Sequence, residues 1–480
     1  MRDRFRRAVS VVALLAVAGC GGGGSAPAAV TPTPTPTTST PAVSSTCALR
    51  TRQDWALSVL REWYLFPETL PVAPDPTPFS TVGSYIDSLT ATARAQRRDR
   101  FFTYLTSIAE ETAFITSGSS AGFGFRLQTD ATARRAFITE VFETAPAFAA
   151  GLDRGDEILA IGTSTADLRN VSDIIAAEGT AGVTNALGPS TVGLSRTLRV
   201  QSPSGAVRVV SATKADYSLS PLSSRYGAKI IDDGGRKVGY LNLRTFGTST
   251  ANQQLRDAFA TFKAQGVTNV IVDFRYNGGG LVSTAQLLGD LLGGNRSTTE
   301  IFSVETFRPE KASNNETKRF SPQAESISPV RIAFIGTGST ASASEMVING
   351  LVPFFGTNLA LIGSNTFGKP VGQVAIDRSA CDDRLRVVAF SSKNGAGSDN
   401  YYDGLAGAVQ ASCRATDDPS KQLGDPQEAM TRQALDFIAG RACTAIAASS
   451  QGALSATAGR LTMLTPAEPT VAQREVPGLF

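Results

Sequence analysis

The 480-residue sequence contains no histidine. This absence excludes Ser-His-Asp and Cys-His catalytic groups, HExxH zinc sites and most catalytic zinc chemistry. A nucleophilic serine in this chain would need another general base, and a lysine shielded from water is the usual substitute. The four cysteines beyond position 20 show no CxxC spacing, so we expect neither a metal nor a cofactor.

The sequence also lacks a strong excess of charge. It has 45 Lys and Arg against 42 Asp and Glu, a net charge of +3. Nucleic-acid binding calls for a basic face rather than scattered charge, so we expect no nucleic-acid partner. The 42% of apolar residues is enough to build real cores, and the length is typical of about two to four domains.

Residues 1–20 are typical of a lipoprotein signal peptide. Four arginines precede a short apolar run, residues 11–17, that is too short to span a bilayer. Residues 16–20 (Ala-Val-Ala-Gly-Cys) resemble a bacterial lipobox, which implies cleavage before Cys20 and lipidation of that cysteine. This predicts a protein anchored in the cell envelope and facing the periplasm, and Gly21 favours the outer membrane. Ordinary secretory cleavage is the alternative.

Residues 21–46 are a Thr/Pro-rich linker that favours extended polyproline II conformation. Four cysteines follow, and an even number in an exported protein predicts two disulfides. Three pairings are possible. We favour Cys381–Cys413, which closes one loop region, and Cys47–Cys443, which would join the start of the folded part to its end.

The remaining chain divides by pattern into four parts. Residues 47–118 have helical periodicity, and residues 120–215 are glycine-punctuated and rich in strands. Residues 225–445 alternate strands (238–243, 270–274, 331–335, 359–362) with helices (252–265, 281–292, 342–352), which is typical of an α/β domain with its site at the carboxyl ends of the strands. Residues 446–480 are expected to be largely a disordered tail.

A serine-rich segment, residues 338–345 (Gly-Ser-Thr-Ala-Ser-Ala-Ser-Glu), lies between a predicted buried strand and an amphipathic helix. A serine at such a turn is near the positive end of the helix dipole and near free backbone N–H groups, and both stabilise a developing oxyanion. The same residues are also favourable in an ordinary helix cap.

Two further segments carry chemistry. In residues 366–373 (Thr-Phe-Gly-Lys-Pro-Val-Gly-Gln), Lys369 follows Phe367 and a glycine, where partial desolvation would lower its pKa and let it act as a base. A surface-loop lysine is the alternative.

In residues 273–280, three glycines let backbone N–H groups approach an anion. A phosphate loop is disfavoured because G-x-x-x-x-G-K-[ST] is missing, and a tight turn remains an alternative.

These three segments, in this order, resemble those of the carboxyl-terminal processing (tail-specific) peptidases, a serine–lysine protease family, and the likeness covers most of residues 50–445. The resemblance implies that Ser342 is the nucleophile, Lys369 the general base and Gln373 the residue that orients the lysine. It places the oxyanion hole at backbone N–H groups near Gly278, Gly279 and Ala343. It also implies an α/β peptidase core of ClpP/crotonase-like spiral βαβ units, an N-terminal helical segment and an inserted, mostly β PDZ domain.

The segment 120–215 contains two PDZ-like stretches. The loop formed by Gly122, Phe123, Gly124 and Phe125 resembles the carboxylate-binding loop of a PDZ domain, and residues 145–159 resemble its helix, turn and strand. Such a domain binds the C-terminal residues of a partner as an added strand. The resemblance therefore implies an endopeptidase that captures envelope or exported proteins by their C-termini and cleaves them through an acyl-enzyme.

Two alternatives compete with this interpretation. Penicillin-interacting serine–lysine enzymes use S-x-x-K, S-D-N and K-T-G. Residues 211–214 and 398–400 match the first two patterns, but the third is missing. A non-catalytic lipoprotein could use the PDZ domain to bind peptides on the same fold, although the joint presence of Ser342, Lys369 and Gln373 argues against it.

Overall fold

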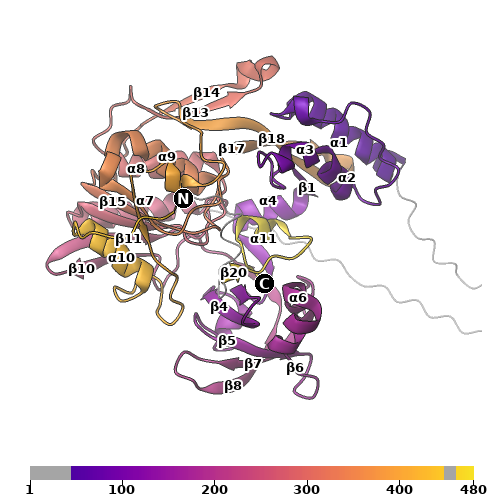
Figure 1. The fold of residues 1–480 in the computed structure, drawn as a ribbon, viewed down its shortest axis with the longest axis horizontal. Helices are drawn as coiled ribbons and strands as arrows, with labels where there is room; N and C mark the ends of the chain where they lie inside the picture. The colour runs from indigo at the N-terminus through magenta and orange to yellow at the C-terminus, as the bar shows by residue number, and fades with distance from the viewer. Residues whose placement is uncertain (1–44, 448–460) are drawn as a thin grey trace, which may run out of the picture. The chain divides into compact units, whose positions relative to one another are not determined.

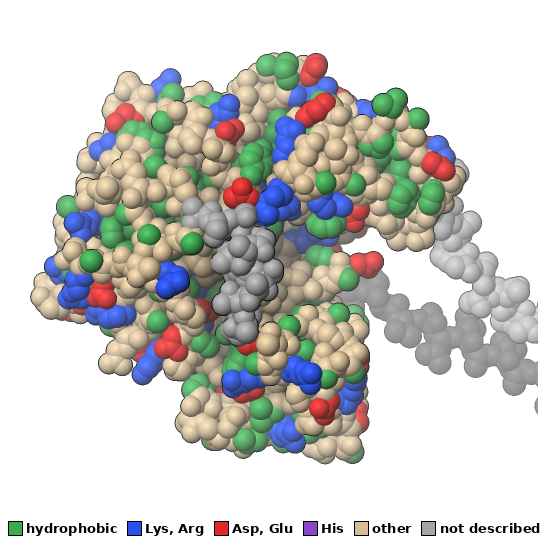
Figure 2. All heavy atoms as spheres, viewed as in Figure 1, with side chains coloured by type: hydrophobic (Ala, Val, Ile, Leu, Met, Phe, Trp, Pro, Cys, Tyr) green, Lys and Arg blue, Asp and Glu red, His purple; other side chains and the backbone are tan. Residues whose placement is uncertain are grey.

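The computed structural model describes residues 45–447 and 461–480. The predicted signal peptide, the lipidation residue Cys20 and residues 21–44 of the predicted linker lie outside these ranges. In the described part of the chain, no helix has both the length and the hydropathy that crossing a bilayer requires. On the face shown in Figure 2, positive and negative side chains are interspersed, in keeping with the balanced composition.

The predicted α/β domain contains a six-stranded sheet. Its strands, in spatial order, are β10 (Ala228–Asp233), β11 (Arg236–Asn242), β12 (Asn269–Asp273), β15 (Arg331–Gly336), β16 (Leu359–Gly363) and β19 (Ala411–Arg414). All are parallel except β10. The connecting helices are α7 (Ala251–Ala264), α8 (Val282–Leu292) and α9 (Ala343–Phe355). The predicted alternation of strands and helices in this region is therefore confirmed.

Side-chain alternation along the strands builds a core on each face of this sheet. Val270 and Val272 face the cluster formed with α7, α8 and α9, whereas Ile271 faces α10 (Ala429–Ile438). Figure 1 shows α7, α8 and α9 on one side of the sheet and α10 on the other. The loops after β12, β15 and β16 leave the same edge and carry the three segments singled out in the sequence.

A second sheet joins distant parts of the chain. Its strands are β1 (Tyr104–Ser107), β18 (Asp383–Asn394), β13 (Ile301–Phe307), β14 (Glu316–Arg319) and, paired with β18, β17 (Val371–Arg378). Three helices cover it with apolar side chains, namely α1 (Leu49–Trp63), α2 (Val82–Leu89) and α3 (Ala91–Ala95). The expected helical region 47–118 thus also supplies an edge strand, β1, followed by α4 (Ile108–Ser117).

We call residues 119–218 the β-rich domain. It comprises β2 (Ser119–Gly122), β3 (Phe125–Asp130), β4 (Arg135–Val141), α5 (Pro146–Ala149), β5 (Glu157–Gly162), β6 (Arg169–Asn170), α6 (Val171–Leu187), β7 (Ser195–Gln201), β8 (Val207–Thr213) and β9 (Ala215–Ser218). Strands predicted near residues 136–138, 157–161 and 207–210 are confirmed. The core contains Phe123, Phe125 and Ile138, packed against α6.

The expectation of a disordered tail is wrong for residues 461–480. This segment, which we call the C-terminal segment, forms β20 (Thr462–Met463), paired with β3, and a short helix, α11 (Val471–Glu475). Val476, Leu479 and Phe480 are buried. The sequence of this segment has little periodicity and therefore predicted no helix or strand. Its order comes instead from contacts with distant residues. Residues 448–460 lie outside the described ranges.

The favoured disulfide pairing is also wrong. The disulfides are Cys47–Cys381 and Cys413–Cys443, with Cα atoms 5.5 and 5.4 Å apart. The packing of α1 against β18 brings Cys47 to the turn between β17 and β18, where Cys381 lies. Cys413 is in β19, and the chain returns beside it after α10, where the backbone N–H of Arg414 donates to the carbonyl of Thr444 at 2.7 Å. Each disulfide therefore forms where tertiary packing brings two distant parts of the chain together.

Candidate active site

Ser342 occupies a strained turn at the start of α9. Its φ of 54° and ψ of −117° are rarely adopted by residues other than glycine. The backbone N–H of Ser342 donates to Glu345 Oε2 at 3.1 Å. The serine is half-buried and lines a cavity of about 160 Å³. A sharp strand-to-helix turn therefore presents this serine to a space where a substrate could bind.

The neighbouring Ser344 has a different environment. It is fully buried, and its hydroxyl donates to the carbonyl oxygen of Asn277 at 3.2 Å. Thr340 similarly donates to the carbonyl of Phe274 at 2.8 Å. These two hydroxyls fasten the serine-rich segment to the loop after β12. Of the residues in this segment, Ser342, the predicted nucleophile, is the one that lines the cavity.

Lys369 and Gln373 lie together at the start of β17. Lys369 Nζ donates to Gln373 Oε1 at 3.1 Å and lies 4.9 Å from the centre of the Phe102 ring. Burial lowers the pKa of Lys369, an effect that the carboxylates of Glu475 and Asp99 oppose. Gln373 Nε2 donates to the carbonyl of Phe102, which fixes the amide with its oxygen toward the lysine.

The carboxylate of Glu345 joins the serine and lysine segments. Besides the N–H of Ser342, it accepts the N–H groups of Gly368 at 2.6 Å and Lys369 at 2.8 Å. Burial raises the pKa of Glu345, although these hydrogen bonds act in the opposite direction. No hydrogen bond in the described part of the chain connects Ser342 Oγ with Lys369 Nζ. Glu345 is therefore the link between them.

The sequence analysis did not identify this role of Glu345. The available signal was the glutamate three residues after a serine at a helix start, which is a capping pattern. It also missed Arg100, whose Nη2 donates to the carbonyls of Phe367 and Gly368, each at 2.6 Å. The guanidinium stacks on the Phe367 ring at 4.3 Å. Arg100 thus holds the lysine loop from the N-terminal region.

The glycine turn after β12 lies against Ser342. The carbonyl of Asn277 accepts the N–H of Ala341 at 3.1 Å, and Asn277 Oδ1 accepts the N–H of Gly279 at 2.9 Å. The N–H of Gly279 is therefore occupied within the turn. For the backbone N–H groups of Gly278 and Ala343, no acceptor is found among the described residues. Of the three predicted oxyanion donors, these two are free to bind an anion.

The predicted peptide-binding loop lies at the start of β3. The N–H groups of Gly124 and Phe125 donate to the backbone oxygen of Phe480 at 2.7 and 3.4 Å. Phe123 and Phe125 stack in the core, with ring centres 5.6 Å apart. A Cβ at Gly124 would lie 2.0 Å from that of Ala145, so the loop requires glycine there. None of these residues lines the cavity beside Ser342.

Buried ion pairs connect the β-rich domain to the glycine turn. Arg126 of β3 pairs with Glu140 at 2.7 Å and donates to the carbonyl of Tyr276 at 2.6 Å. Arg244 also pairs with Glu140, at 2.7 Å. Although burial alone would raise it, the pKa of Glu140 is lowered to about 2 by Arg244 and Arg126. The carboxylate thus remains charged between two guanidinium groups.

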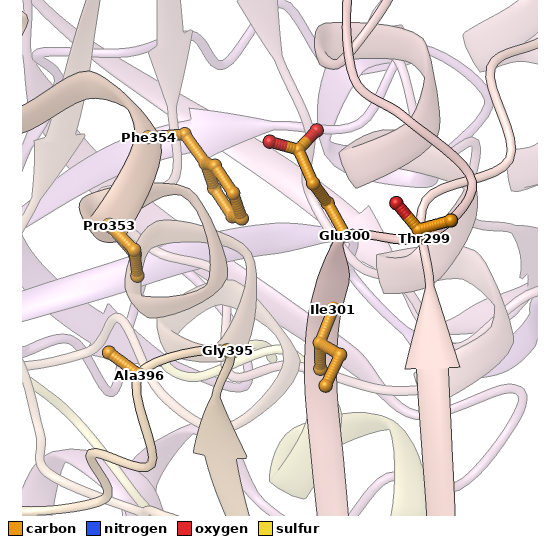
Figure 3. Close-up of a pocket in the computed structure, with 7 residues that line it drawn as sticks. All are labelled: Thr299, Glu300, Ile301, Pro353, Phe354, Gly395 and Ala396. Atoms are coloured by element: carbon orange, nitrogen blue, oxygen red, sulfur yellow. The ribbon is translucent and has the colours of Figure 1, made fainter.

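A second hollow lies elsewhere on the chain. Figure 3 shows Phe354 and Glu300 on opposite sides of it, with Ile301 at the start of β13 below. It holds none of the predicted site residues. Within the described ranges, no group of three or more acidic or cysteine side chains could hold a metal ion.

Comparisons with known proteins agree with the predicted family. The model of the family described as peptidase family S41 matches residues 237–395, which include Gly278, Ser342, Lys369 and Gln373. A carboxyl-terminal-processing protease from Picosynechococcus sp. is 27% identical over 259 residues, which is 53% of this chain and 55% of that protein. The chloroplastic C-terminal processing peptidase of Tetradesmus obliquus is 27% identical over 285 residues, 55% of this chain and 54% of that protein. The match thus spans about half the length of these relatives.

A solved structure extends the likeness to the fold. A Bacteroides fragilis protein assigned to the S41 proteases has a TM-score of 0.62 with this chain at 23% identity. The match covers 80% of this chain and 97% of that one. This similarity shows a shared fold that extends beyond the region of the family match.

Proposed function

We propose that this protein is a serine endopeptidase of the tail-specific type, because residues 237–395 match the model of peptidase family S41. Ser342 is its nucleophile and Lys369 its general base. The single observation that carries the proposal is the position of Ser342 at a strained helix start, lining a cavity with Gln373, the partner of Lys369. Glu345 links the two segments that carry the reacting groups.

The mechanism follows from these positions. Neutral Lys369 swings on its flexible stem from Gln373 toward Ser342 and accepts the hydroxyl proton as Oγ attacks the scissile carbonyl carbon. The N–H groups of Gly278 and Ala343 donate to the resulting oxyanion. The protonated lysine gives its proton to the leaving amine. Water then loses a proton to Lys369 and attacks the acyl carbon. The protonated lysine returns that proton to Ser342 Oγ as the ester bond breaks, which releases the carboxylic acid product and restores neutral Lys369.

We propose that the β-rich domain is a PDZ domain inserted ahead of a ClpP/crotonase-like spiral core. Its loop of Gly122, Phe123, Gly124 and Phe125 would receive the C-terminus of a protein or peptide substrate. Two features support this role. The N–H groups of Gly124 and Phe125 donate to one backbone oxygen, and the edge of β3 opposite β4 accepts an added strand.

The proposed location is the cell envelope, with the protein anchored through lipid on Cys20 and facing the periplasm. Gly21 favours the outer membrane. The two disulfides support an oxidising compartment, since such bonds are rare in reducing ones. Envelope or exported proteins are then the substrate class.

Digestion of an unstructured protein such as casein, with product masses recorded, tests the proposed activity. Ser342→Ala and Lys369→Met should each reduce the rate by about a thousandfold or more. Ser339→Ala, in the same segment but outside the cavity, is the matched control and should retain the parental rate. Equal digestion by Ser342→Ala and the parent would refute the assignment. Peptide binding without any turnover by the parent would instead support a non-catalytic binding protein.

A further inference from the structure

The C-terminal segment, residues 461–480, lies along the free edge of β3. Its first part pairs antiparallel with the end of β3, Thr462 with Thr129 and Met463 with Gln128. Its last residues pair with the start of β3. The N–H of Leu127 donates to the carbonyl of Gly478 at 2.8 Å, and the N–H of Phe480 to that of Phe125 at 3.0 Å. The segment therefore occupies the edge that an added peptide strand would use.

The side chains of this segment anchor it on both sides. Phe480 is 2% exposed and enters the core of the β-rich domain, together with Leu464. Val476 and Leu479 are as deeply buried, in a cluster with Phe114 of α4. Burial of large apolar side chains stabilises such a contact through the hydrophobic effect. Because several such side chains are buried, the C-terminal segment is firmly packed against the β-rich domain and α4.

The same segment covers the proposed catalytic site. Val471 and Glu475 of α11 line the cavity that contains Ser342. The helix is held beside α4, as Figure 1 shows, and the N–H of Val471 donates to Glu110 Oε1 at 3.0 Å. A Cβ on Gly278 would lie 3.1 Å from the backbone oxygen of Glu475. The backbone of α11 therefore packs against the glycine turn that carries the proposed oxyanion donor Gly278.

The conformation of α11 beside the cavity suits a segment that blocks the site and not one that is cleaved there. Residues 471–475 are helical, so each backbone carbonyl is directed along the helix axis. Their peptide bonds therefore lack the extended conformation that would present a carbonyl carbon to Ser342 Oγ. Arg126 also holds the following turn, by donating to the carbonyl of Pro477 at 3.1 Å. The carboxylate of Glu475 raises the pKa of Lys369 against the lowering by burial, which favours the charged amine that cannot accept a proton.

We propose that the C-terminal segment is a tethered inhibitory ligand: residues 478–480 occupy the peptide groove of the β-rich domain while α11 covers Ser342. The inference rests on the proposed function and adds its regulation. Peptides with the sequence of residues 478–480, Gly-Leu-Phe, compete for the groove and release α11. The groove and the catalytic cavity are thereby coupled through one piece of chain.

Two variants of the full chain test the inference on a short fluorogenic peptide too small to need the groove. Phe480→Asp places a charge in an apolar core and should raise kcat/KM about tenfold or more, because the segment leaves the cavity. Ala467→Asp adds the same charge at an exposed position of the segment and should keep the parental rate. Equal rates for the two variants would contradict the proposal. Phe480→Ala gives a milder test if the aspartate prevents folding.

A peptide in trans provides a test without mutation. The peptide Val-Pro-Gly-Leu-Phe should activate the parent in a saturable manner, whereas Val-Pro-Gly-Leu-Asp should not. Absence of activation at peptide concentrations that saturate binding would overturn the proposed coupling. Loss of residues near 471–476 from the parent but not from Ser342→Ala, seen by mass spectrometry, would identify the segment as a substrate instead.

Amide hydrogen exchange separates this inference from the proposed function. The N–H groups of Gly124 and Leu127 should be protected in the parent and exchange faster in Phe480→Asp, whether or not the protein cleaves any peptide. Unprotected amides in the parent would refute the docking of the segment. Protected amides in a protein with no Ser342-dependent cleavage would refute the proposed function alone.

Discussion

Lys369 donates a 3.1 Å hydrogen bond from Nζ to the side-chain oxygen of Gln373. The glutamine cannot turn freely, because its Nε2 is held by the carbonyl of Phe102 from the N-terminal region. The lysine amine is therefore held by a group that accepts a hydrogen bond and carries no charge. A carboxylate in the same place would keep the lysine protonated, so the amide is suited to hold a general base.

Replacing Gln373 tests this positioning role. Gln373→Ala should lower kcat about tenfold to a hundredfold, because the amine of Lys369 loses its orientation. KM should change little, because the proposed peptide groove of the β-rich domain is unaltered. Gln373→Glu should move the rise of the pH–rate profile to higher pH, since a carboxylate favours charged Lys369. Gln253→Ala on an exposed face of α7 is the control. An unchanged profile in Gln373→Glu would contradict the role.

The pH dependence of kcat/KM should report Lys369. Because its neutral form is the proposed base, the rate should rise with pH and reach half of its maximum below the ordinary lysine pKa of about 10.4. The direction follows from burial, which lowers the pKa of Lys369. Asp99 and Glu345 also raise the pKa of Lys369 electrostatically, and Arg386 lowers it.

Removing the charge of Glu475 should move this profile. Its carboxylate raises the pKa of Lys369, so Glu475→Gln should shift the midpoint to lower pH. Glu468→Gln, at an exposed position of the same segment, should leave the midpoint in place. A shift to higher pH in Glu475→Gln would show that the carboxylate does not act on the lysine.

Gly279 should tolerate no side chain. Its φ is 118°, and a Cβ there would lie 2.8 Å from the Cβ of Ser342. Gly279→Ala should therefore lower kcat/KM by about a hundredfold or more by displacing the serine. Gly266→Ala, at φ 65° with no atom within 4 Å of its Cβ, isolates the backbone strain of about 1–2 kcal/mol from the clash. Comparable activity losses in the two variants would refute the proposed contact.

The two disulfides should differ in their contribution to stability. Their sequence separations are 334 residues for Cys47–Cys381 and 30 for Cys413–Cys443. In the chain-entropy account, the longer loop stabilises by about 2 kcal/mol more. The Cys47→Ser, Cys381→Ser double variant should therefore lose more free energy of unfolding in urea than the Cys413→Ser, Cys443→Ser variant. The reverse order would contradict this account.

Local patterns determined much of this protein from the sequence alone. The absence of histidine excluded imidazole catalysis. The alternation of apolar strands and amphipathic helices correctly predicted β11, β12, β15 and β16 with α7, α8 and α9, but not β13 and β14 of the second sheet. The serine-rich segment was singled out because it lies between a buried strand and a helix, and the family resemblance predicted Ser342 as its nucleophile. The roles predicted for Lys369 and Gln373 came from the resemblance of residues 366–373 to a segment of the serine–lysine peptidase family. Each of these inferences depends on neighbours in the chain.

Tertiary structure decided what depends on distant residues. Cys47 meets Cys381, and not Cys443, because α1 packs on β18. Glu345 was visible only as a helix cap until folding brought the N–H groups of Gly368 and Lys369 to its carboxylate. Residues 461–480 have no periodicity of their own, and their order comes from the edge of β3 and from α4. Long-range packing leaves no local signature, so only the folded chain reveals that Val471 and Glu475 line the same cavity as Ser342.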